Sequence, residues 1–486
     1  MAKIIIIHYG GVLINGKYKT FIFYEGLVSE LTKNGNDVME IITNDFLEIP
    51  WNGSNHLKFG INGKKLMNDL IHFKPDLVIS FNNSSIAGLE NKVSCPIVIW
   101  DADHIYHFND LDKLKTNKDR YLFFCSQSSD IDDCQKILGV DPKKCFLVKP
   151  ATSIRSDISC KKKRNILFIG TPFGTVEEKE KLFRYRKAYV GLAREVLERK
   201  ESAEDLIFKY RHKIPKADQT ILDFGSAANR SNTLAHVAPL GLNIHGGDEW
   251  LNVGLDFSLD IFYAYDPRKI YSVGQTQEAY NSSRIGLNIN HSQAKSGYSW
   301  RVMDILASSA VLVSNYSQDL ADELGDLSKE IFYDNPQEAY MLCSKLLKNE
   351  ELRKDIVRQS NEIVRRFHTW EVRVSEIEKI LKIGLVHNRT QKGRYILLDA
   401  QDYRTTFGDV ICDPRNKKRF LMKVFFFFLP YGLVKFLSGK SEESVFFATV
   451  KNFKISDGLR PTFLVRLLRF ILPYGFVHLV RSLRKL

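Results

Sequence analysis

Short, uninterrupted runs of apolar residues recur along the first 125 residues of this chain, and helical stretches separate them. Runs that are apolar on both faces are typical of parallel strands covered by helices on both sides of a sheet. A helix is expected over residues 21–34, with Gly35 ending it. The expected strands are Lys3–His8, 37–43, 76–81, 96–100 and 121–125. The sequence therefore predicts an α/β fold that begins with a parallel sheet.

The same pattern begins again after a basic stretch at residues 160–164, which is typical of a solvated linker between domains. Strands are expected at residues 165–170, 242–245, 284–289 and 310–314. Helices are expected at residues 298–307, over most of 336–383, and in a charged insertion at 175–217.

At 486 residues the chain is long enough for two or three domains. We expect two Rossmann-like domains with a central cleft, then a crossover helix and linker, and then a tail. The predicted bounds are 1–155, 160–370, 371–410 and 411–486, in that order.

The termini and the cysteines point to the cytoplasm. The apolar run that follows Met1 is too short for a signal peptide, and no stretch has the length of a spanning helix. The seven cysteines are scattered without metal-site spacing, which is typical of free thiols in a reducing compartment.

The net charge of +13 is concentrated in the tail, where residues 411–486 hold 15 Lys and Arg against 4 Asp and Glu. These basic residues lie among Phe, Leu and Val, and residues 429–434 recur nearly unchanged as 472–477. The pattern predicts a basic, amphipathic helical tail that binds anionic lipid at the inner face of the cell membrane. A pair of helices that packs on the enzyme body is the alternative. Nucleic acid is not expected as a partner, because the basic residues are not spread over a groove.

Residues 241–373 carry several motifs in order. They are residues 241–246 with Trp250, 279–290, 301–307, 311–314, and 366–370 with Arg373. In this order they resemble the CgeB-like glycosyltransferases, a branch of the two-domain GT-B superfamily. The resemblance covers about a quarter of the chain, with weaker support from residues 168–170.

The resemblance implies that the second domain binds a nucleotide-sugar donor and that the first domain faces the acceptor. Arg301 at the start of a helix suits a diphosphate, because its guanidinium group and backbone N–H groups match phosphate oxygens. Asp304, one turn later, can accept hydrogen bonds from ribose; a surface pair with Arg301 is the alternative. The expected donor-binding residues are Gly170, Gly246, Trp250, Asn290, Tyr298, Ser299, Arg301 and Asp304.

Three positions depart from the family pattern. Asp304 stands where the family usually has Glu, and Ser308 and Ser309 replace a Cys-Gly pair. Ser296 lies eight residues before Asp304, so the paired glutamates of retaining GT-B enzymes are absent. The resemblance therefore leaves both a retaining and an inverting outcome open.

Sugar transfer also needs a base that activates the acceptor hydroxyl. Asp101, Asp103 and His104 follow the strand at 96–100, at the sheet edge where ligands bind, and each is a candidate base. A strand-end turn capped by Asp is the alternative. Gly10 and Gly11 follow the first strand and would let an acceptor or phosphate approach the backbone, unless they only form a tight turn.

Asp101 and Asp103 also fit a metal-dependent GT-A glycosyltransferase, in which two carboxylates hold a divalent cation. The donor-like motifs lie about 150 to 200 residues downstream, which favours GT-B, without a metal or other cofactor. A non-catalytic membrane-surface scaffold and a sugar-nucleotide epimerase are the other hypotheses. We expect a glycosyltransferase that adds sugar to a lipid-linked cell-envelope glycan, such as lipopolysaccharide or capsule.

Overall fold

The computed structural model describes most of the chain up to residue 405. The described residues are 1–14, 17–49, 53–173, 188, 192, 195, 203–210, 212–213, 217–387 and 392–405. The predicted tail at 411–486 and most of the predicted insertion at 175–217 lie outside the described residues.

The chain divides into two compact units. One consists of Met1–Leu57 and Met67–Asp399, and the other of Lys58–Leu66 and Ala400–Leu486. Within the second unit, the backbone N–H of Asn62 donates to the carbonyl of Tyr403. Both large sheets lie in the first unit.

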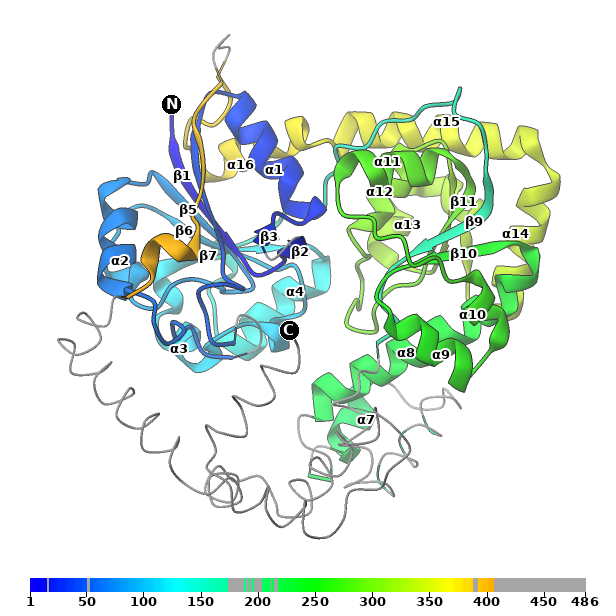
Figure 1. The fold of residues 1–486 in the computed structure, drawn as a ribbon, viewed down its shortest axis with the longest axis horizontal. Helices are drawn as coiled ribbons and strands as arrows, with labels where there is room; N and C mark the ends of the chain where they lie inside the picture. Colours follow the sequence, from blue (N-terminus) through cyan, green and yellow to red (C-terminus); the bar gives the residue numbers. More distant parts are fainter. Residues whose placement is uncertain are drawn as a thin grey trace, which may run out of the picture. The chain divides into compact units, whose positions relative to one another are not determined.

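The first sheet has seven strands, and every pairing in it is parallel (Figure 1). In spatial order these are β14 (Tyr395–Leu397), β4 (Asp37–Ile42), β1 (Lys3–His8), β5 (Leu77–Phe81), β6 (Ile97–Trp100), β7 (Tyr121–Cys125) and β8 (Cys145–Leu147). Strand β1 is buried from Ile4 to His8, as a strand covered on both faces must be. Strand β14 was not predicted, because residues 395–397 were expected to belong to a linker.

The second sheet has five strands, also all parallel. They are β10 (Leu242–His245), β9 (Arg164–Ile169), β11 (Ser283–Asn288), β12 (Val311–Asn315) and β13 (Phe332–Tyr333). Its core is formed by the apolar side chains of these strands and of the helices packed on them. The predicted α/β class with two parallel sheets is confirmed. A separate antiparallel hairpin joins β2 (Val12–Ile14) and β3 (Lys17–Lys19).

Helices pack on both sheets (Figure 1). In the first half they are α1 (Ile22–Lys33), α2 (Gly63–His72), α3 (Leu111–Thr116) and α4 (Ser128–Asp133). In the second half they are α7 (Ala203–Tyr210), α8 (Ala217–Val237), α9 (Glu249–Asp256), α10 (Leu259–Ala264), α11 (Val273–Asn281), α12 (Arg301–Ala307), α13 (Gln318–Leu324), α14 (Pro336–Lys348), α15 (Glu350–Phe367) and α16 (Trp370–Leu381). No helix among the described residues has the length and apolar character needed to span a bilayer.

Local sequence explains where several helices begin. The Ser272 hydroxyl and the Gln275 side chain form a capping box at α11. Asn335, Asn349 and Thr369 each accept a backbone N–H in the first turn of α14, α15 and α16. These side chains satisfy donors that a helix start would otherwise leave unpaired.

Helix α16 packs against α1, so residues beyond α15 return to the core of the first sheet. A Cβ on Gly26 of α1 would lie 2.0 Å from Trp370 Nε1, so glycine permits this approach. The Trp370 ring lies 6.1 Å from the ring of Trp300, which in turn lies 5.9 Å from Trp100 on β6. This aromatic cluster fixes the segment just before α12 against the first sheet.

The basic stretch at residues 160–164 is not a solvated linker along its whole length. Arg164 already belongs to β9, and the Lys162 ammonium donates to the backbone carbonyls of Asn281 and Ser309. Burial lowers the pKa of Lys162 to about 8. The expectation of full exposure was wrong because these buried carbonyls need donors.

Candidate functional site

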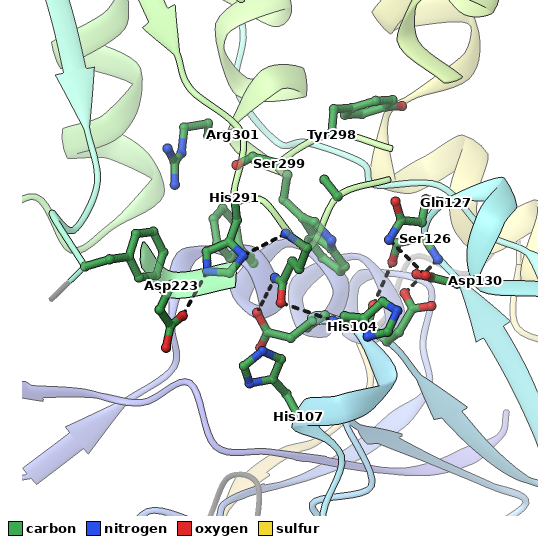
Figure 2. A pocket seen from close by; sticks show the side chains of 18 of the residues that line it. His104, His107, Ser126, Gln127, Asp130, Asp223, His291, Tyr298, Ser299 and Arg301 are labelled. Carbon is green, nitrogen blue, oxygen red and sulfur yellow. Dashed lines mark hydrogen bonds and ion pairs between the residues drawn. The ribbon is translucent and has the colours of Figure 1, made fainter. Parts of the chain in front are cut away.

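A pocket of about 440 Å³ is lined by residues that follow strands of both sheets (Figure 2). Six of the residues predicted from the sequence line it, namely Asp101, Asp103, His104, Tyr298, Ser299 and Arg301. They come from two separate parts of the chain, about 200 residues apart. The structure therefore brings the expected base candidates and part of the expected donor site to one place.

Asp101 lines the pocket and is bonded to residues at and just before the start of α4. Its Oδ1 accepts the backbone N–H of Ser126 over 2.7 Å, and its carboxyl is hydrogen-bonded to Asp130. Burial and the Asp130 charge raise the pKa of Asp101 well above its ordinary value, and burial also raises the pKa of Asp130. These shifts favour the protonated form of the carboxyl pair, and the Asp101 side chain is already engaged by Ser126 and Asp130.

Asp103 is held as a carboxylate by neutral donors. The Tyr9 hydroxyl, the Asn82 amide over 2.9 Å and the Gln293 amide over 3.0 Å all donate to it. Burial alone would raise its pKa, but the attraction of His107 and these hydrogen bonds outweigh burial and lower it. Asp103 therefore supplies a fixed negative charge at the pocket.

Three histidines line the pocket (Figure 2). His104 Nε2 lies 2.9 Å from Asp133, and its Nδ1 accepts the Tyr106 N–H over 3.4 Å. His291 Nε2 lies 3.2 Å from Asp223, and its Nδ1 accepts the Gln293 N–H over 3.1 Å.

The third histidine, His107, differs in its hydrogen bonding. Its Nε2 is buried and has no hydrogen-bond partner among the described residues. The ring of His107 lies 6.5 Å from that of His291.

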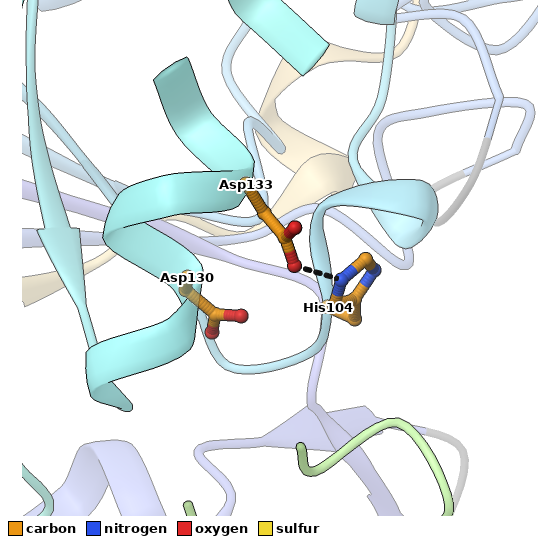
Figure 3. Close-up of side chains that lie close together, drawn as sticks. All are labelled: His104, Asp130 and Asp133. Atoms are coloured by element: carbon orange, nitrogen blue, oxygen red, sulfur yellow. Dashed lines mark hydrogen bonds and ion pairs between the residues drawn. The ribbon is translucent and has the colours of Figure 1, made fainter. Parts of the chain in front are cut away.

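In the described part of the chain, His104, Asp130 and Asp133 have ligand atoms close enough together to hold a metal ion, within 4.8 Å of one another (Figure 3). Asp133 also pairs with the Lys295 ammonium at 3.1 Å, so a positive charge is already present there. Asp101 and Asp103, by contrast, face different partners and do not form a two-carboxylate clamp.

Two buried arginines also line the pocket. Arg230 on α8 and Arg301 on α12 both line it, and both stack on the Phe168 ring at 5.6 and 5.7 Å. Arg301 Nη1 and Arg230 Nε are buried without a hydrogen-bond partner, and no ion pair to either residue is present in the described part of the chain. Burial lowers the pKa of both groups, and the charge of Arg301 adds to this effect on Arg230. Arg230 donates to the backbone carbonyls of Thr171 and Ile289, and the nearby Asp304 carboxyl attracts Arg301 without an ion pair between them. Two such cations beside one pocket are an anion-binding arrangement.

Four other predicted donor residues contact one another or residues that line the pocket. They are Gly170, Gly246, Trp250 and Asn290. Trp250 Nε1 donates to the Gly170 carbonyl over 2.7 Å, and a Cβ on Gly246 would lie 2.1 Å from that same oxygen. Asn290 Oδ1 accepts the backbone N–H of Ser299 over 3.1 Å. None of these four residues lines the pocket.

Asp304, Gly10 and Gly11 also lie outside the pocket lining. Asp304 is buried and accepts a hydrogen bond from Thr152, so the alternative of a surface pair with Arg301 is wrong. A Cβ on Gly10 would lie 2.7 Å from the Tyr24 ring, and one on Gly11 would lie 2.5 Å from Ile42. Close packing alone therefore explains why glycine is required at both positions.

Three residues of the pocket were not predicted from the sequence, namely Arg230, His107 and His291. Arg230 is a single arginine on a helix of mostly small polar residues, and its sequence context carries no motif. His107 could have been predicted from the sequence, because it ends the short 3₁₀ turn that begins after His104 and so follows the same strand, β6.

Residues 230–379 match a family model described as glycosyl transferase-like. No curated protein matches the chain.

Several solved structures are similar in fold. T4 phage β-glucosyltransferase in complex with UDP-glucose is 13% identical, with 78% of this chain and 100% of the phage chain covered, at a TM-score of 0.41. HepE from Anabaena in complex with UDP and glucose is 10% identical to this chain. The match covers 79% of this chain and 100% of HepE, at a TM-score of 0.46. A glycosyltransferase from Rickettsia africae is 10% identical to this chain. The match covers 80% of this chain and 99% of the Rickettsia chain, at a TM-score of 0.45.

The family match begins at Arg230, near the end of α8, and includes all of α12 with Arg301. Residues 230–379 therefore form a glycosyl transferase-like domain, and the expectation of a glycosyltransferase is confirmed by this domain.

Proposed function

We propose that this protein transfers a sugar from a nucleotide-sugar donor to an acceptor hydroxyl, and that both substrates meet in the pocket described above. The observation that carries the proposal is the pair Arg230 and Arg301, two buried guanidinium groups that each have an unpaired nitrogen and form no ion pair with a carboxylate of the described residues. A diphosphate would supply the missing acceptors for both.

The physical reason is the cost of a buried charge. A buried guanidinium group without an anionic partner destabilises the fold, so it is retained where a ligand compensates for it. A charge-assisted hydrogen bond to phosphate contributes about 1.5–3 kcal/mol. Two such groups also stabilise the negative charge that develops on the leaving diphosphate during transfer.

Our proposal includes no metal and no other cofactor. Arg230 and Arg301 would provide the positive charge that a divalent cation provides in metal-dependent enzymes. UDP-glucose is the first donor to test, because the T4 enzyme and HepE were both solved with it. We also propose that the chain belongs to the CgeB-like branch, on the ordered motifs between residues 241 and 373.

The proposed acceptor is a lipid-linked cell-envelope glycan, such as lipopolysaccharide or capsule. The support is the basic, apolar composition of residues 411–486, which suits an anionic membrane surface. The protein would then act in the cytoplasm at the inner face of the membrane, where such acceptors are assembled.

A thermal-shift screen against nucleotides and nucleotide sugars, with and without EDTA, tests this function. A ligand that binds the folded state raises the Tm by mass action. A shift with one nucleotide class that EDTA does not change supports the proposal. A shift abolished by EDTA would instead favour a metal at His104, Asp130 and Asp133, and the absence of any shift would favour a non-catalytic scaffold.

A further inference from the structure

The three histidines of the pocket differ in how their ring nitrogens are used. Both nitrogens of His104 and both of His291 have partners. His107 Nε2 has none among the described residues, although it is buried. Buried polar atoms are nearly always hydrogen-bonded, so an unpaired one beside a pocket points to a ligand.

We propose that His107 is the catalytic base of the sugar transfer, and that it takes the proton from the acceptor hydroxyl through Nε2. This rests on the transfer reaction proposed above. It differs from the three bases expected from the sequence, because Asp101 is hydrogen-bonded to Ser126 and Asp130, Asp103 already accepts three hydrogen bonds, and His104 is bonded at both nitrogens.

Charged groups around His107 favour this role. Asp103 lies close enough to His107 for their charges to attract. Three neutral donors fix that carboxylate, so its charge is in place before the proton moves. It would stabilise the imidazolium that forms on His107, and Asp103 is in this account a positioning residue.

The acceptor oxygen gives its proton to His107 Nε2 and forms a bond to the anomeric carbon of the donor sugar. The bond between that carbon and the diphosphate oxygen breaks, and its electron pair leaves with the nucleoside diphosphate beside Arg230 and Arg301. The imidazolium then releases its proton to solvent.

The test compares His107→Gln and His107→Ala with a control, His72→Gln, which changes an exposed histidine on α2. Water serves as the acceptor, and the release of nucleoside diphosphate is measured with the nucleotide sugar that gives the largest thermal shift. General-base catalysis contributes about 10²–10⁴-fold, so we expect a loss of that size in kcat for both variants. Donor affinity should change by less than about twofold, since His107 does not touch the diphosphate in this account.

Added imidazole distinguishes a base from a structural residue. It should restore part of the activity of His107→Ala, because it can enter the space left by the ring and accept the proton. Wild-type rates in His107→Gln, or a loss in His107→Ala that imidazole does not rescue, would overturn the assignment. Donor binding by the wild-type protein would still stand in those cases, so the failure of this inference is distinguishable from the failure of the proposed function.

Discussion

The Thr152 hydroxyl donates a 2.5 Å hydrogen bond to the Asp304 carboxyl, across 152 residues of sequence. Asp304 is buried on α12, one turn after Arg301, and Thr152 follows strand β8 at the edge of the first sheet. Burial raises the pKa of Asp304 to about 7, and neither Thr152 nor the charge of Arg301 offsets this. The bond therefore joins a titratable group to the connection between the two sheets.

This relationship predicts a pH-dependent stability. An unfolded Asp has a pKa of about 3.9, so the folded state binds the extra proton between about pH 4 and 7. The stabilisation is complete below pH 4 and is lost as the pH rises through about 7. Asp304→Asn should therefore raise the free energy of unfolding relative to wild type at pH 8, on the order of 2 kcal/mol, and have little effect at pH 4.

Denaturant unfolding at both pH values measures this difference. Asp132→Asn, which changes an exposed carboxyl on α4, is the matched control and should show no such dependence. A variant that gains nothing at pH 8 would contradict the buried, proton-binding state of Asp304.

The close approach of Gly246 to Gly170 gives a second prediction. A Cβ at Gly246 would lie 2.1 Å from a backbone oxygen, which cannot move as a side chain can. Gly246→Ala should lower stability by about 1–3 kcal/mol. Gly274→Ala on α11 is the control, because no atom lies within 4 Å of its Cβ; alanine should stabilise that helix by about 0.5–1 kcal/mol. Equal effects at the two positions would refute the packing argument.

Inorganic pyrophosphate should bind the arginine pair without any sugar or base. We expect it to raise the Tm of the wild-type protein, and expect Arg230→Met to reduce that rise strongly. Arg358→Met serves as the control, since Arg358 is exposed and paired with Asp355. A pyrophosphate shift that survives in Arg230→Met would place the anion elsewhere.

The proposed membrane contact predicts a separable tail. Removing residues 411–486 should abolish co-sedimentation with phosphatidylglycerol vesicles, because each basic residue near an anionic surface contributes about 1 kcal/mol. Vesicles of phosphatidylcholine alone should bind the full chain weakly. Nucleotide binding should persist in the shortened protein; its loss would mean that the tail belongs to the folded body.

The sequence predicted the sheets better than the helices. Strands such as Lys3–His8 and Leu242–His245 were placed correctly, because a buried parallel strand must be an unbroken apolar run. The helix expected from residue 298 begins only at Arg301, because the rings of Tyr298 and Trp300 are held by tertiary contacts. Helix α8 was missed, since its many small polar residues give no clear apolar period.

Part of the site could also be predicted from the sequence. Residues at the ends of strands, such as Asp101 and Asp103, were expected at the pocket because parallel strands end at a common edge. Which carboxyl keeps its charge could not be predicted, because the donors Tyr9 and Gln293 come from distant segments. Arg230 owes its role to burial beside Arg301, which only the fold reveals.

Calorimetric titration of Arg301→Met with the nucleotide sugar that binds best is the most direct test of the arginine pair. The wild-type protein and Arg358→Met are titrated in parallel. Loss of a charged hydrogen bond to phosphate should weaken donor binding by about 10- to 150-fold, or about 1.5–3 kcal/mol, in Arg301→Met alone. Equal affinity in all three proteins would contradict the claim that this pocket binds the donor diphosphate.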